Sequence, residues 1–166
     1  MRQSNGHRPG QGSGRLMGLD VGEKTIGIAL SDELGFTAQP YQNLKRKGDD
    51  EDLHALRILL DEREVSTVVV GLPKNMDGSL GRQARKVAAF GEKIEKAFHV
   101  PVVHWDERLS TVAAERVLIQ ADLSRAKRKK HVDKLAAAVI LQGYLDSDPA
   151  AGVVSRPPPA TDLSES

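Results

Sequence analysis

Three acidic residues, far apart along the chain, stand where carboxylates could do chemistry. Asp20 ends a short apolar run, and Glu107 follows another one. Asp133 shares a helix face with the apolar residues three, four and seven positions later, Ala136, Ala137 and Ile140. A buried carboxylate without a partner costs several kcal/mol, so a residue in such a place needs a cation or a neutral state.

Each acid also has a plainer explanation. Asp20 fits a turn residue before Gly22, Glu107 fits a solvated loop, and Asp133 fits a salt bridge to a nearby lysine or arginine. Together they suit a hard divalent cation, because oxygen ligands in a sequence without cysteine favour magnesium or manganese over zinc. Two such ions about 4 Å apart can activate water and stabilise the leaving oxygen in phosphodiester hydrolysis.

Two further segments could bind the phosphates of such a substrate. A Gly-rich loop at 71–81 can offer amides and side chains to phosphate, and its candidate contacts are Lys74, Asn75, Gly78 and Ser79. Five cations in six residues precede the helix of Asp133, and we expect this basic loop to contact a nucleic-acid backbone through Arg125, Lys127, Arg128, Lys129 and Lys130. Arg108 is a further candidate for contact with the nucleic acid. The alternative for 71–81 is a plain capped turn, and the alternative for 125–130 is a solvated loop.

The composition limits the class of protein. Over 166 residues, 24 Lys and Arg face 23 Asp and Glu, so attraction to a polyanion must come from local clusters. The absence of cysteine excludes a disulfide scaffold, a thiolate zinc site and a cysteine nucleophile. No apolar run approaches the ~18 residues of a membrane span, and residues 1–14 do not resemble a secretory signal. We therefore expect a cytoplasmic protein without a membrane partner.

The elements that must position the acids follow from hydrophobic periodicity. Runs at 16–21 and 25–30 predict a β-hairpin, and a third strand at about 36–44 continues the meander. The pattern then alternates, predicting helices at 49–64, 83–98, 111–123 and 131–145 and buried strands at 67–72 and 100–105. This α/β order predicts a mixed five-stranded sheet flanked by helices. We expect one domain at 15–146 between flexible tails at 1–14 and 147–166.

In combination, four ordered motifs resemble the YqgF/RuvX family of ribonuclease H-like nucleases. They lie at 18–22, 70–79, 106–111 and 133–137, so the resemblance covers essentially all of 15–146. It implies that Asp20, Glu107 and Asp133 form an acidic triad that is both catalytic and binds magnesium or manganese. It also implies a ribonuclease H-like sheet of order 3-2-1-4-5, with strand 2 antiparallel and Asp20 on the central strand.

The resemblance implies a metal-dependent endonuclease, with structured RNA as substrate, in 5′-end maturation of pre-16S rRNA. A Holliday junction resolvase acting on branched DNA is one alternative, and a non-catalytic nucleic-acid-binding module is another. The residues 20–25 also resemble the phosphate loop of actin-like ATPases. Those ATPases close two such domains on a nucleotide, so we expect no nucleotide cofactor here. A monomer and a homodimer are both compatible with the sequence.

Overall fold

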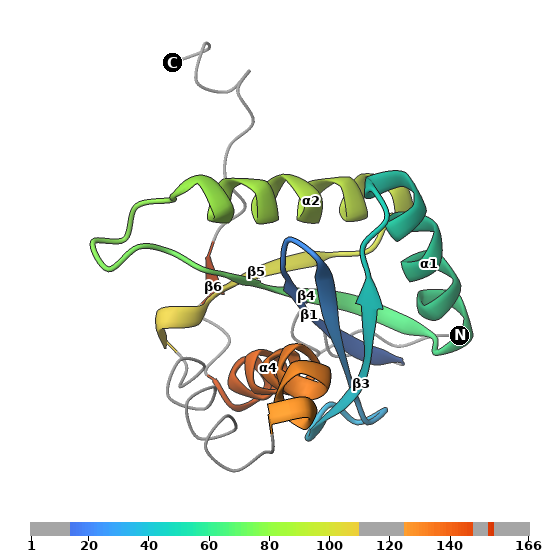
Figure 1. The fold of residues 1–166 in the computed structure, drawn as a ribbon. Helices are drawn as coiled ribbons and strands as arrows, with labels where there is room; N and C mark the ends of the chain where they lie inside the picture. Colours follow the sequence, from blue (N-terminus) through green and yellow to red (C-terminus); the bar gives the residue numbers. More distant parts are fainter. Residues whose placement is uncertain (1–13, 110–124, 148–152, 155–166) are drawn as a thin grey trace, which may run out of the picture.

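The protein is built around an open, twisted sheet with helices on both faces (Figure 1). The computed structural model describes residues 14–109, 125–147 and 153–154. The strands lie in the order β3-β2-β1-β4-β5-β6. The five longer ones are β1 (Arg15–Val21), β2 (Thr25–Ser31), β3 (Ala38–Lys45), β4 (Val65–Leu72) and β5 (Val102–Asp106).

The direction of each strand matches the expected topology. β1, β2 and β3 form an antiparallel meander, in which Asp20 of β1 lies opposite Gly27 of β2. β1 pairs in parallel with β4, and β4 pairs in parallel with β5. The order 3-2-1-4-5 with an antiparallel second strand is therefore confirmed. β6 (Val153–Val154) adds a short antiparallel edge beside His104 and Trp105, from within the segment 147–166 that was expected to be a tail.

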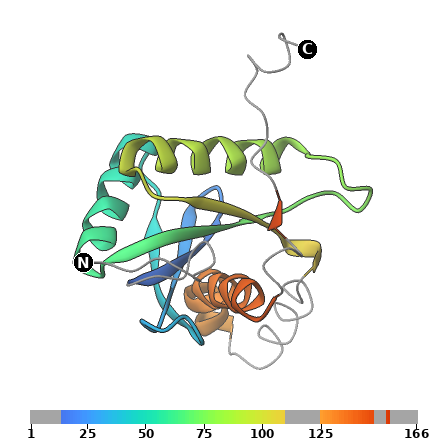
Figure 2. The same ribbon diagram turned by 180° about the vertical axis from the view of Figure 1, so that it is seen from behind.

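Two separate apolar layers hold the helices to the sheet (Figures 1 and 2). α1 (Asp49–Glu62) and α2 (Arg82–Phe98) cover one face, where Met17, Leu19, Val68 and Val70 pack with Leu56, Phe90 and Ile94. α4 (Arg125–Asp146) lies on the other face, where Leu16, Ala29, Val69 and Trp105 pack with Ile140 and Leu141. Among the described residues, no helix is long and apolar enough to cross a membrane.

The start of α4 corrects one expectation. Residues 125–130 were predicted to be a basic loop before a helix at 131, but the helix already begins at Arg125. The reason is that Arg, Lys and Ala are all strong helix formers, and no Gly or Pro interrupts the chain before Gly143. The helix expected at 111–123 lies outside the described residues.

Two glycines allow α4 to approach the sheet closely. A Cβ atom on Gly18 of β1 would lie 2.7 Å from Cβ of Leu141 and 3.0 Å from the carbonyl oxygen of Ala137. A Cβ atom on Gly71 of β4 would lie 2.5 Å from Cδ1 of Ile140. A side chain at Gly18 would push the helix away from the sheet, because the atoms that it meets cannot rotate away. At Gly71 it would instead displace the ends of the Ile140 and Glu107 side chains.

We predict that Gly18→Ala destabilises the protein by about 1–3 kcal/mol, because the added methyl group meets backbone and a Cβ atom that cannot rotate away. Urea unfolding measures the loss. Gly81→Ala is the matched control, since its new methyl group would meet only the side chain of Asn75, at 3.3 Å, and this side chain can move. Equal stability of Gly18→Ala and the parent would contradict the close packing described here.

Candidate active site

Asp20 lies on the sheet face that α4 covers. Side chains alternate between the two faces of a strand. Leu16 and Gly18 of β1 contact α4, whereas the intervening residues pack on the side of α1 and α2, namely Met17, Leu19 and Val21. Asp20 therefore shares the α4 side with Gly18, and it is only 8% exposed. The side chain of Asp20 is therefore buried at the carboxyl end of the central strand.

Glu107 reaches the same face from a neighbouring part of the sheet. It is the first residue of the short 3-10 helix η1 (Glu107–Leu109), directly after β5. Its Oε2 atom lies 2.8 Å from where a Cβ atom on Gly71 would be, beside Ile140 of α4. Since Leu19 pairs with Val70, Gly71 lies next to Asp20 across the β1–β4 pair. The fold thus brings Asp20 and Glu107 to one end and one face of the sheet.

The third predicted acid is carried by the helix that covers this face. Asp133 belongs to α4, one turn before Ala137, whose carbonyl oxygen approaches Gly18. The side chain of Asp133 lies outside the described residues, as do those of Arg125, Lys127, Arg128, Lys129 and Lys130. Among the side chains that the structure does describe, no three His, Asp or Glu residues gather as a metal site.

Asp106, the neighbour of Glu107, has a different role. His104, two residues earlier, approaches Gly91 of α2, so alternation directs Asp106 to the face opposite to Glu107. Its carboxylate is 3% exposed and accepts bonds from the backbone amide of Arg108 (2.9 Å) and from Nη2 of that residue (2.8 Å). Burial alone would raise the pKa of Asp106, but the bonds and charge of Arg108 hold it below its usual value. Asp106 in turn raises the pKa of Arg108.

Arg108 also connects η1 to the Gly-rich loop between β4 and α2. Its Nη1 atom donates to the carbonyl oxygens of Asn75 (3.5 Å) and Met76 (3.3 Å). Arg108, which the sequence predicts to contact the nucleic acid, thus also holds η1 against this loop. Lys74 lies close enough for its charge to lower the pKa of Asp106 as well.

The loop itself is closed by its own hydrogen bonds. The amide of Gly78, which has a φ of 89°, donates to the Asn75 carbonyl, and the amide of Asn75 donates to the Ser79 carbonyl. The amide and hydroxyl of Ser79 donate to Oδ1 of Asp77 at 2.9 and 2.6 Å, and these bonds lower the pKa of Asp77. The amides of Gly78 and Ser79 and the Ser79 hydroxyl, which we expect to donate to a phosphate, already donate to acceptors within the loop. Their contact with a substrate remains a prediction.

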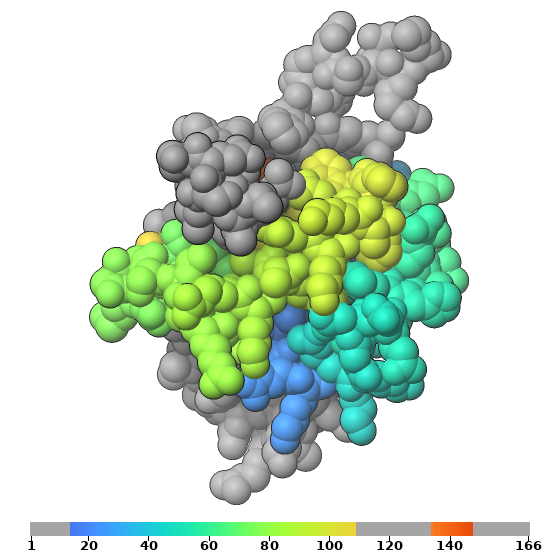
Figure 3. All heavy atoms as spheres, turned by 90° about the horizontal axis from the view of Figure 1, so that it is seen from above, coloured from blue at the N-terminus to red at the C-terminus, as the bar shows by residue number. Residues whose placement is uncertain are grey.

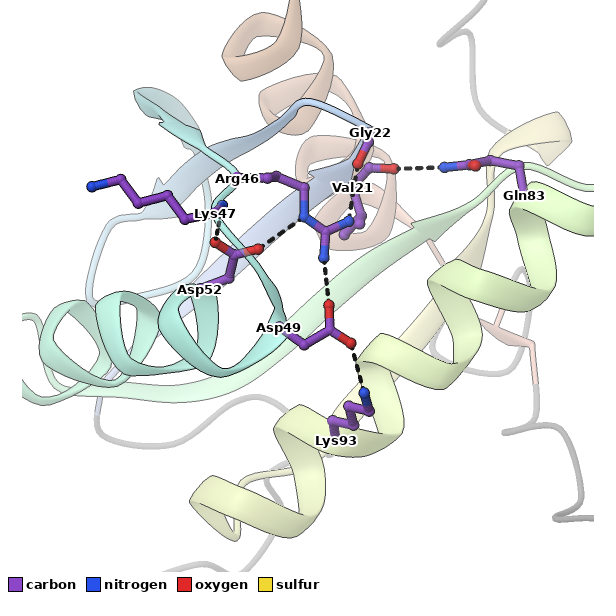
Figure 4. A network of polar contacts seen from close by, with 8 residues as sticks. All are labelled: Val21, Gly22, Arg46, Lys47, Asp49, Asp52, Gln83 and Lys93. Carbon is purple, nitrogen blue, oxygen red and sulfur yellow. Dashed lines mark hydrogen bonds and ion pairs between the residues drawn. The ribbon is translucent and has the colours of Figure 1, made fainter.

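A polar network holds the turn that follows Asp20 (Figure 4). Nη1 of Arg46 donates to the Gly22 carbonyl at 3.1 Å, and Nε2 of Gln83 donates to the Val21 carbonyl at 3.4 Å. Arg46 is itself fixed by ion pairs to Asp49 and Asp52, each at 2.9 Å. The sequence predicted a helix at 49–64 but gave no role to Arg46, whose partners become visible only in three dimensions.

We predict that Asp106→Asn lowers stability by about 1–3 kcal/mol at neutral pH, because Arg108 loses its charged acceptor. The pH dependence is the sharper test. The lowered pKa of Asp106 stabilises the folded state above the ordinary value of 3.8, and this gain is lost as pH falls through the folded pKa. As the pH falls below about 4, the parent should therefore lose stability more steeply than the variant.

Urea unfolding across this pH range measures the difference. Asp61→Asn is the control, since Asp61 is exposed and pairs only with Arg57, at 3.4 Å, on the surface of α1. It should change stability by less than about 1 kcal/mol. Identical acid profiles for the parent and Asp106→Asn would contradict the role given to the pair.

Curated relatives align with 80% of the chain. The chain is 58% identical over 133 residues to a protein of Desulforamulus reducens named "Putative pre-16S rRNA nuclease", covering 80% of this chain and 97% of the relative. A protein of Clostridium acetobutylicum with the same name is 56% identical over 133 residues, covering 80% of this chain and 98% of the relative. Both alignments span nearly the full length of the relative.

A solved structure shares the fold of this chain, and a family profile identifies its family. A structure of Thermus thermophilus RuvC in complex with a Holliday junction substrate superposes with a TM-score of 0.55 at 16% identity, covering 84% of this chain and 99% of RuvC. The ribonuclease H-like fold expected from the sequence is thereby confirmed. The profile of the RuvX family, described as "Holliday junction resolvase", matches residues 14–147. With most of its length matched by this profile and by close relatives, the chain belongs to the RuvX family.

Proposed function

We propose that the protein is an endonuclease that hydrolyses phosphodiester bonds of structured RNA in 5′-end maturation of the 16S rRNA precursor. The observation that carries this proposal is the meeting of Asp20 and Glu107 on one sheet face, beneath the helix that contains Asp133. The names of the curated relatives support RNA as the substrate and hydrolysis as the reaction.

The donor set fits a divalent cation of the magnesium or manganese type. Asp20 is nearly buried, and the missing side chain at Gly71 leaves room for the carboxylate of Glu107. All donors are hard oxygen atoms, which these cations prefer. We assign Asp20, Glu107 and Asp133 as the residues that would hold it. When bound, such an ion supplies Lewis acidity for the attacking water and the leaving oxygen.

The rest of the chain would bind and orient the substrate. The basic start of α4 brings Arg125, Lys127, Arg128, Lys129 and Lys130 to the helix that carries Asp133, so cations near the acids could match substrate phosphates. Asp106 and Arg108 link η1 to the β4–α2 loop, and this link would position Glu107 relative to Lys74, Asn75, Gly78 and Ser79.

A Holliday junction resolvase is the second candidate function. It is favoured by the fold that the chain shares with RuvC and by the description of the family profile. Both functions use the same acids, and the choice depends on contacts with the 2′-hydroxyl and with the shape of the substrate.

We predict that the protein with manganese cleaves a 5′-extended 16S rRNA transcript near its mature 5′ end and leaves a four-way DNA junction of equal concentration largely intact. Gel analysis of both labelled substrates measures this preference. Chelator and Asp20→Asn serve as controls that should abolish cleavage. Exclusive cutting of the junction would overturn the RNA assignment in favour of the resolvase.

We predict a separable signature for Asp133→Asn. If three carboxylates converge, removing one charge relieves repulsion, so the metal-free variant should melt at the same temperature as the parent or higher. Manganese should stabilise the variant less, because a ligand is lost, and cleavage should fall by orders of magnitude. Melting curves with and without manganese, together with cleavage assays, measure both effects.

Asp146→Asn is the matched control on the same helix, since Asp146 is exposed and accepts a bond from Gln142 at 2.9 Å. It should keep both activity and the response to manganese. A loss of about 3–5 kcal/mol in metal-free Asp133→Asn with activity retained would instead identify Asp133 as half of a buried salt bridge.

A further inference from the structure

A cleft of about 320 Å³ lies beside the turn that connects β1 and β2. The turn residues 21–23 form one wall, and Gln83, Lys86 and Val87 of α2 form another. Figure 3 shows this turn, in blue, set in a hollow between α2 and α1. Val21, which lines the cleft, directly follows Asp20 along β1, so the Cα atoms of these two residues are about 3.8 Å apart. The cleft therefore adjoins the site, on the opposite side of β1.

Two buried valines and a paired arginine lie at the base of the cleft. Val21 and Val87 are 6% and 1% exposed. Arg46, which also lines the cleft, lies over the ring of Phe90 at 4.9 Å. Its charge is balanced by Asp49 and Asp52, and Asp49 is bound in turn by Lys93, so the guanidinium forms a rigid and nearly neutral wall (Figure 4).

Two opposite charges line the same cleft without pairing. Glu23 and Lys86 are both exposed, and neither side chain makes a hydrogen bond or ion pair with any residue of the described part of the chain. The carboxylate can only accept hydrogen bonds and the ammonium can only donate them. A ligand that satisfies both must present donors on one edge and acceptors on another.

A phosphate group does not meet this requirement, because Glu23 would repel it. Among the four RNA bases, guanine alone has two adjacent donors, N1–H and N2–H₂, that match one carboxylate, and its O6 and N7 atoms accept from a lysine. Its flat ring would lie in the cleft between the turn and α2. We propose that this cleft binds an unpaired guanine base of the substrate, next to the bond that is cleaved.

This inference rests on the proposed function, since it names a feature of the same substrate. RNA is read in sequence mostly at unpaired nucleotides, whose bases leave the stack and bind in pockets by their edges. The cleft would thus select cleavage beside a single-stranded guanine, while the acids on the other side of β1 act on the backbone.

The test compares binding of two labelled single strands by fluorescence anisotropy, in chelator so that no cleavage occurs. One strand contains uridines only, and the other has one central guanosine. We expect the parent to bind the guanosine strand roughly tenfold more tightly. Glu23→Gln and Lys86→Met should each reduce this ratio to near one. The control variants Glu62→Gln and Lys96→Met, at exposed positions near the ends of α1 and α2, should keep it.

The ratio separates base recognition from general charge. If Glu23 and Lys86 acted only through charge, their variants would change the affinity of both strands equally, and an unchanged ratio would overturn the proposal. Equal affinity of the parent for both strands would overturn it too. Guanosine monophosphate should compete better than adenosine or uridine monophosphate. Its selective binding without a strand preference would make the cleft a free-nucleotide site and overturn the link to the substrate.

Failure here and failure of the proposed function are distinguishable. The strand ratio is measured without metal and without cleavage, so its absence leaves the nuclease assignment intact. Absence of cleavage in the manganese assay would equally leave the measured base preference unchanged.

Discussion

The close contact of α4 with the sheet is the constraint on which the candidate site depends. Gly18 and Gly71 remove two side chains from one face, so that Leu141 and Ile140 can lie directly on β1 and β4. The same missing side chain at Gly71 admits the carboxylate of Glu107. The absence of side chains at these glycines therefore both seats the helix that carries Asp133 and leaves room for the carboxylate of Glu107.

A second set of contacts fixes the site from the other face. Arg46 and Gln83 hold the carbonyls of Gly22 and Val21, so the end of β1 is tied to β3 and to α2. Arg108 ties η1 to the β4–α2 loop in the same way. The end of β1, which bears Asp20, and η1, which bears Glu107, are thus braced by arginines, at a place where a sheet without such contacts would fray.

Sequence patterns predicted most of the fold, because hydrophobic periodicity and the order of strands and helices are local signals. They also predicted a buried strand at 100–105, and its residues Trp105 and His104 are 2% and 1% exposed. The start of α4 was wrong because like charges suggested a loop, whereas helix propensity prevails there. Asp106 and Arg46 were missed for another reason. Asp106 looks like any acid in a polar motif, and the contacts of Arg46 with Gly22 and Asp52 join segments whose proximity depends on the folded chain.

The alternation of side chains at the end of β5 limits how this protein can change. Asp106 and Glu107 are consecutive, yet Asp106 binds Arg108 on the side of α2, and Glu107 lies beside Gly71 beneath α4. A single substitution leaves this alternation of side chains unchanged. An inserted or deleted residue between Trp105 and Arg108 would exchange the two faces and remove both roles at once. Any homologue that keeps the roles of Asp106 and Glu107 must therefore keep the length of this segment as well as its residues.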